Sequence, residues 1–108
     1  MRRTRSRWLA GCALAGTAVA ITAHAHSPVL SCYEEKDATI VCEGGFSDGT
    51  SAEGVALRVL DSRNKVLVDG KMDKSSTFTF KKPTVDYHVV FDAGEGHSVT
   101  IYGGDITE

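Results

Sequence analysis

From residue 28 onward, short runs of alternating apolar and polar residues are separated by clusters of Gly, Asp, Asn and Ser. Alternation with a period of two is typical of half-buried β-strands, and no stretch repeats at the helical spacing. The clusters at residues 47–49 and 62–64 tolerate left-handed backbone or hydrogen-bond their own main chain, which favours turns. The pattern predicts seven strands, at residues 29–35, 38–46, 54–61, 65–72, 76–81, 86–92 and 97–103.

Seven short strands in a chain of this size predict a small all-β sandwich with a single core. Within the predicted strands, alternate residues face the core and the solvent. Phe78 and Phe80 are therefore expected in the core, and if Tyr87, Val89 and Phe91 face the core, His88 faces outward. The sequence contains no internal repeat and no sign of a second domain, so residues 26–108 are expected to form one β-sandwich domain.

The first 25 residues have the composition of an export signal. Residues 1–7 carry four arginines and no acid, and residues 8–21 form an apolar stretch that is short and rich in small side chains. Small residues at positions 23 and 25 predict cleavage after Ala25. The sequence Leu-Ala-Gly-Cys ending at Cys12 offers lipidation as an alternative, although almost no apolar segment precedes it. We therefore expect a periplasmic or secreted protein, with no direct membrane insertion after signal cleavage.

The charge balance changes when the leader is removed. The full chain has 12 basic and 14 acidic residues and a net charge of −2, whereas residues 26–108 keep 8 basic and all 14 acidic residues, a net charge of −6. An acidic domain without a basic stripe is a poor match for nucleic acid and a reasonable one for cations. The sequence contains no nucleophile elbow and no phosphate-binding glycine loop, and it supports no pairing of two carboxylates for catalysis. The protein is therefore not expected to be an enzyme.

Two cysteines, Cys32 and Cys42, remain in residues 26–108. An even number of cysteines in an oxidising compartment favours a disulfide over a pair of thiolates that bind a soft metal. If the first two strands form a hairpin centred on Asp37, Cys32 falls directly opposite Cys42. Directly opposed residues on neighbouring strands satisfy the short separation that a disulfide requires.

Three histidines are candidate metal ligands. Cleavage after Ala25 would make His26 the first residue, so that its α-amine and imidazole could chelate one ion. His97 closes the glycine-rich turn at residues 94–97, and His88 faces outward from a predicted strand. Nitrogen ligands suit nickel, cobalt, copper or zinc better than calcium or magnesium. The alternatives are a frayed terminus for His26, an exposed loop position for His97 and an ordinary surface position for His88.

Several segments together resemble a known periplasmic family. They are residues 39–49 (Thr-Ile-Val-Cys-Glu-Gly-Gly-Phe-Ser-Asp-Gly), residues 66–73 (Val-Leu-Val-Asp-Gly-Lys-Met-Asp), residues 78–80 (Phe-Thr-Phe) and residues 92–97 (Asp-Ala-Gly-Glu-Gly-His). The chain resembles the small auxiliary proteins of energy-coupling-factor nickel and cobalt transporters, which have transthyretin-like or carboxypeptidase-regulatory-like domains. The resemblance implies a seven-stranded transthyretin-like or immunoglobulin-like sandwich that handles a metal ion, with a membrane transporter component as partner.

The leading expectation is thus a periplasmic nickel- or cobalt-binding accessory protein for metal uptake or handling, with His26, His97 and His88 as candidate ligands. The alternative is a noncatalytic carboxypeptidase-regulatory-like sandwich that binds a protein partner. Transthyretin-like folds also include hydroxyisourate hydrolases, which end in Tyr-Arg-Gly-Ser. Residues 101–105 of this chain read Ile-Tyr-Gly-Gly-Asp instead, so that hydrolase activity is not expected.

Overall fold

The computed structural model describes residues 26–108, so the predicted signal peptide, its cleavage point after Ala25 and Cys12 lie outside the described residues. Each strand begins and ends within two residues of its predicted bounds. Neither short helix in this part of the chain could span a membrane. The elements are β1 (Pro28–Glu35), η1 (Lys36–Ala38), β2 (Thr39–Phe46), β3 (Ala56–Asp61), β4 (Val66–Lys71), β5 (Thr77–Lys81), β6 (Tyr87–Asp92), β7 (Ser98–Tyr102) and η2 (Gly103–Asp105).

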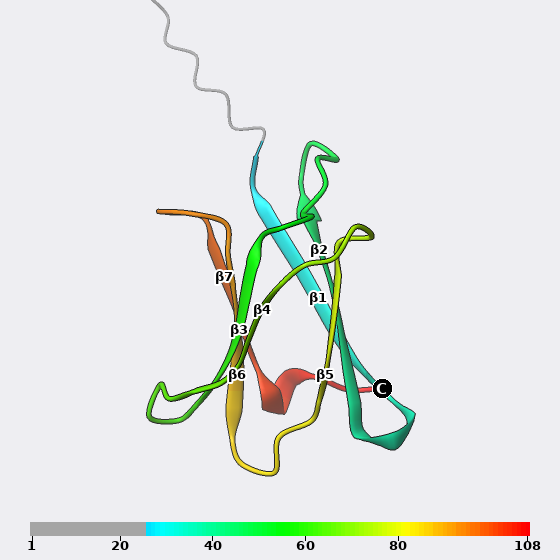
Figure 1. The fold of residues 1–108 in the computed structure, drawn as a ribbon, viewed down its shortest axis with the longest axis vertical. Helices are drawn as coiled ribbons and strands as arrows, with labels where there is room; N and C mark the ends of the chain where they lie inside the picture. Colours follow the sequence, from blue (N-terminus) through cyan, green and yellow to red (C-terminus); the bar gives the residue numbers. More distant parts are fainter. Residues whose placement is uncertain (1–25) are drawn as a thin grey trace, which may run out of the picture.

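The strands form two antiparallel sheets that pack face to face (Figure 1). One sheet has the order β1-β2-β5 and the other has the order β4-β3-β6-β7. The all-β, seven-stranded sandwich is therefore confirmed. If the strands are lettered in chain order as in immunoglobulin domains, the two sheets are A-B-E and C′-C-F-G. In the constant type of immunoglobulin domain the fourth strand pairs with the fifth, whereas here β4 pairs with β3.

The hairpin of β1 and β2 has the predicted register. It turns through η1, where Asp37 and Ala38 adopt positive φ values of 63° and 53°. Cys32 lies opposite Cys42, and the two sulfur atoms are bonded at 2.05 Å. The predicted disulfide is confirmed, and the two cysteines supply no thiolate to a metal ion. A disulfide fits an oxidising, extracytoplasmic compartment.

The core lies between the sheets and follows the predicted alternation. Val89 and Phe91 are completely buried, while Phe80 and Tyr87 are nearly so and contact each other edge to face at 6.2 Å. Phe78, near the start of the edge strand β5, is partly buried and packs against this core. Leu57, Val59, Ile40 and Cys42 complete the set of fully buried large side chains.

The two ends of the sandwich carry different side chains. Edge strands β1 and β7 contact each other and run in the same direction, so both begin at one end, which we call the N-terminal end (Figure 1). The opposite, or distal, end holds the turn between β3 and β4, the loop between β5 and β6, and the end of β7. After η2, the chain buries Ile106 and returns to β1, where the Glu34 amide donates to the Thr107 carbonyl at 2.9 Å.

Candidate functional site

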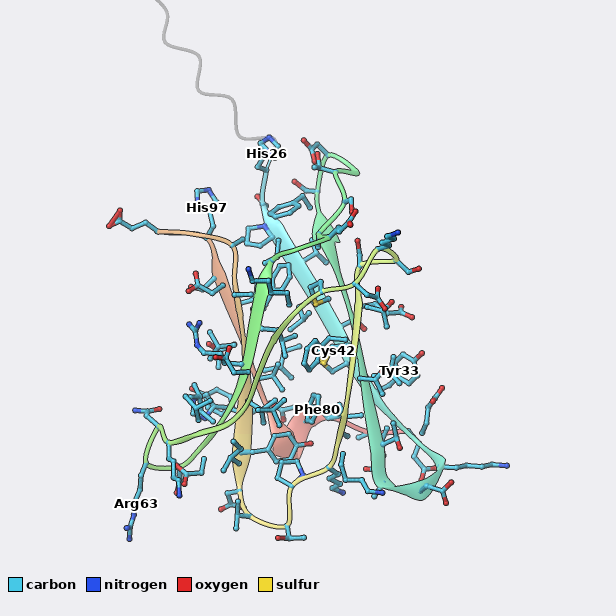
Figure 2. The ribbon with its side chains drawn as sticks, in the orientation of Figure 1. His26, Tyr33, Cys42, Arg63, Phe80 and His97 are labelled. Atoms are coloured by element: carbon cyan, nitrogen blue, oxygen red, sulfur yellow. A yellow bond between two sulfur atoms is a disulfide. The ribbon has the colours of Figure 1, made fainter. Side chains whose placement is uncertain are left out.

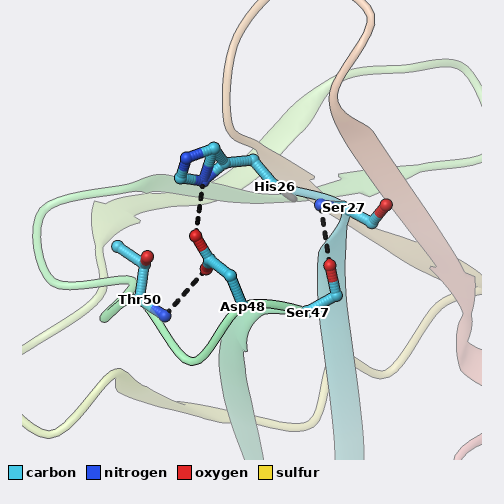
Figure 3. A network of polar contacts seen from close by, with 5 residues as sticks. All are labelled: His26, Ser27, Ser47, Asp48 and Thr50. Atoms are coloured by element: carbon cyan, nitrogen blue, oxygen red, sulfur yellow. Dashed lines mark hydrogen bonds and ion pairs between the residues drawn. The ribbon is translucent and has the colours of Figure 1, made fainter. Parts of the chain in front are cut away.

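His26 and Asp48 meet at the N-terminal end of the sandwich. The β1–β2 ladder, continued beyond its last pair, places Ser27 opposite Ser47 and His26 opposite Asp48. The His26 Nδ1 atom lies 3.3 Å from the Asp48 Oδ2 atom (Figure 3). The same register that aligns the two cysteines thus brings an imidazole beside a carboxylate.

The backbone next to His26 is tied to the facing turn. The Ser27 amide donates to the Ser47 hydroxyl at 3.1 Å, and the Ser47 amide donates to the Ser27 carbonyl at 2.9 Å. The His26 ring packs its edge against Phe46 with a centroid distance of 5.9 Å. Although 61% of the His26 side chain is exposed, the ring contacts both Asp48 and Phe46.

Asp48 is held in place by its own turn. Its Oδ1 atom accepts a hydrogen bond from the Thr50 amide at 3.0 Å, which leaves the Oδ2 atom directed at His26 (Figure 3). Hydrogen bonds from Thr50, and to a lesser degree the charge of His26, hold the pKa of Asp48 below its usual range. The carboxylate is therefore ionised at neutral pH and available to a cation.

His97 lies at the same end of the sandwich as His26 (Figure 2). It precedes the first residue of β7, and the turn before it uses positive φ values of 117° at Gly94 and 75° at Gly96. The His97 Nδ1 atom lies 2.9 Å from the Glu95 carbonyl oxygen. Because a carbonyl oxygen only accepts, Nδ1 carries the proton, and the exposed ring offers the Nε2 lone pair to a ligand.

His88 lies at the distal end and is not brought together with His26 and His97. It faces outward from β6, as predicted, and is paired with Tyr102, the last residue of β7. That pair is four steps along the ladder from the Asp92–Ser98 pair beside His97, about 13 Å at the usual rise of a strand. The structure therefore separates the three candidate histidines into two groups.

The donor set at His26 fits a transition metal only in part. Within residues 26–108, no three His, Cys, Asp or Glu side chains gather where they could hold an ion. His26 and Asp48 supply one nitrogen and one oxygen. A third donor, the α-amine of His26, would arise if the peptide bond before His26 were cut.

Asp48 was not anticipated as a site residue from the sequence. The sequence pattern places it only in the turn predicted at residues 47–49. A signal was nevertheless present, because the hairpin centred on Asp37 that pairs Cys32 with Cys42 also pairs His26 with Asp48.

No protein-family model, curated protein or solved structure matches the chain. Functional inference therefore starts from the residues of this chain.

Proposed function

We propose that the protein binds a divalent transition-metal ion through His26 and Asp48 after removal of residues 1–25. The observation that carries this proposal is the 3.3 Å approach of the His26 Nδ1 atom to the Asp48 Oδ2 atom. In an N-terminal histidine, the α-amine and Nδ1 can close a six-membered chelate ring around one ion. Asp48 would add a charged oxygen to the two nitrogens.

The donor types favour particular ions. Amine and imidazole nitrogens suit nickel and cobalt, as well as copper and zinc, better than calcium or magnesium. The net charge of −6 for residues 26–108 favours accumulation of cations near the surface. His97 lies at the same end of the sandwich and offers its Nε2 atom as a further nitrogen ligand.

An ion held by few protein ligands on an exposed surface keeps positions open for water or for a receiving protein. This arrangement suits delivery of an ion better than permanent storage. Together with the predicted export signal and the resemblance described above, it supports a periplasmic accessory role in nickel or cobalt handling. The partner in this proposal is a membrane transporter component.

Calorimetric titration of the exported protein with nickel tests the proposal. His26→Ala should abolish binding, and Asp48→Ala should weaken it by about tenfold, the effect of losing one charged ligand. His88→Ala is the matched control, because it removes an imidazole from the distal end and should leave the affinity unchanged. If the protein and its His26→Ala variant bind nickel equally well, the proposed site is wrong.

A second candidate function is noncatalytic binding of a protein partner. The edge strand β4 favours it, because Val66 and Leu67 are 48% and 36% exposed and no strand within residues 26–108 pairs with its outer edge. Capture of the same partner from periplasmic extract before and after chelator treatment, by protein purified without metal, would support this function over metal binding.

A further inference from the structure

A second group of side chains lies at the distal end, around an exposed aromatic ring. Tyr102 ends β7 and is 62% exposed. One side of its ring contacts His88, with the ring centroids 5.8 Å apart and the planes tilted by 41°. The remainder of the ring is available to a ligand.

A depression of about 370 Å³ lies beside this ring, between the β3–β4 turn, the start of β6 and the end of β7. Its size is at the lower end of the range for small-molecule sites. Arg63, in the same turn, marks this end of the molecule in Figure 2, far from His26. The depression is lined by Ser62, Asn64, Asp86, Tyr87, His88 and Tyr102.

Three polar side chains that line this depression take no part in the hydrogen bonds of the described fold. Within residues 26–108, the side chains of Ser62, Asn64 and Asp86 make no hydrogen bond. By contrast, the Asp61 and Asp73 carboxylates each accept hydrogen bonds from the backbone of their own turns. The lining therefore retains free donors and acceptors that converge on one space.

The chemistry of the lining selects a class of ligand. A hydroxyl, an amide, a carboxylate and an imidazole together offer both donors and acceptors. The lining contains one carboxylate and no lysine or arginine, so it favours neither an anion nor a highly charged cation. A neutral saccharide has an apolar C–H face that can lie on an aromatic ring and a rim of hydroxyl groups that can hydrogen-bond to such side chains.

A second depression, of about 610 Å³, is also lined by Tyr102. It shares Asp86, Tyr87 and Tyr102 with the first and extends along Pro83 and Val85. Its lining also includes Lys82, whose ammonium group is paired with the Glu34 carboxylate at 3.0 Å. Because Tyr102 lines both hollows, a ligand longer than one sugar ring can contact both.

We propose that the distal end binds a short neutral oligosaccharide. One sugar ring stacks on Tyr102, and its hydroxyl groups bond to Asn64, Asp86 and Ser62. The site is independent of the metal site proposed for His26 and Asp48, which lies at the opposite end.

Nuclear magnetic resonance of the exported protein tests the site, because the imidazole signals of His26, His88 and His97 report on the two ends separately. The probes are maltotriose, cellotriose and the trisaccharide of N-acetylglucosamine, each with its monosaccharide. At least one trisaccharide should shift the His88 signals in a saturable manner, leave those of His26 and His97 in place, and bind more tightly than its monosaccharide.

Substitutions at the aromatic ring and at the turn give the matched controls. Tyr102→Ala should weaken binding by about tenfold or more, whereas Tyr102→Phe, which keeps the ring, should retain most of it. Asn64→Gly keeps a residue that accepts the positive φ of 65° and should weaken binding by up to about tenfold. Tyr33→Ala removes a tyrosine from the other sheet and should have no effect.

Three results would overturn the proposal. The first is that none of the trisaccharides moves the His88 signals at millimolar concentration. The second is a response that is unchanged in Tyr102→Ala. The third is a protein or peptide that occupies Tyr102 while no saccharide does, which would identify this end as a protein interface.

Discussion

Cys32 and Cys42 face each other across the β1–β2 ladder, with their Cα atoms 4.0 Å apart and their sulfur atoms bonded. The bond joins residues separated by ten positions around the hairpin turn. By linking β1 to β2 at this pair, it holds the register that also places His26 opposite Asp48.

Removal of this disulfide should reduce stability substantially. Closing a loop of this length restricts the unfolded chain by about 3 kcal/mol at 25 °C in the chain-entropy description. The double variant Cys32→Ala/Cys42→Ala should lose a similar amount in free energy of unfolding, measured by urea denaturation. Alanine is preferred to serine because Cys42 is completely buried, and a buried hydroxyl would add its own cost. A reductant should destabilise the parent protein and leave the double variant unchanged; equal midpoints for parent and variant would contradict this account.

The close packing of Tyr87 on Gly103 leads to a second prediction, about the stability of glycine-to-alanine variants. A β-carbon on Gly103 would lie 2.5 Å from the Tyr87 Cε1 atom, whereas a β-carbon on Gly104 would meet nothing within 4 Å. Gly103→Ala should therefore cost about 1–3 kcal/mol through overpacking of the largely buried Tyr87 ring. Gly104→Ala should change the free energy of unfolding by no more than about 0.5 kcal/mol. Thermal unfolding of the two variants measures the difference, and equal losses would show that the ring gives way.

The hydrogen bonds of Asp61 lead to a prediction of how the folding stability depends on pH. Its Oδ1 atom accepts hydrogen bonds from the Lys65 and Arg63 amides, and these bonds lower its pKa below the ordinary value of 3.8. A carboxylate with a lowered native pKa stabilises the fold above its unfolded pKa, and this contribution is lost as pH falls through the native pKa. Stability should therefore decrease below about pH 4.

Asp61→Asn keeps an acceptor oxygen in the turn but removes the titrating group. Its melting temperature should fall less than that of the parent between about pH 5 and about pH 2. Asp69→Asn, at an exposed position on β4, is the control. The melting temperature of this variant should fall with pH over the same range as that of the parent. A parent and an Asp61→Asn variant with superimposable pH profiles would contradict the assignment.

The strands and the first hairpin were predictable from the sequence because their signals are local. Alternation marked the core-facing side of β6, and the position of Asp37 in the turn fixed the pairing of the cysteines. Pairing of β5 with β2 was not predictable in the same way, because it depends on which sheet the chain enters after β4. At that crossover the Phe78 ring packs directly onto Gly70, where a β-carbon would lie 2.5 Å from the ring.

The candidate sites show the same division between local and nonlocal information. His26 and His97 were identified from residue type and turn context, and their common end follows from the parallel course of the neighbouring strands β1 and β7. The surroundings of His88 were not predicted. Tyr102 and Asn64 come close to it only when β6 pairs with β7 on one side and β3 on the other.

The most direct measurement is calorimetric titration of nickel into two forms of the protein. One form begins at His26, and the other carries a single alanine before it, which converts the α-amine of His26 into an amide nitrogen. The account predicts that the added residue lowers the affinity by about tenfold or more, since the chelate loses one of its two nitrogens. Equal affinities in the two forms would contradict it, because the ion would then not use the amino terminus.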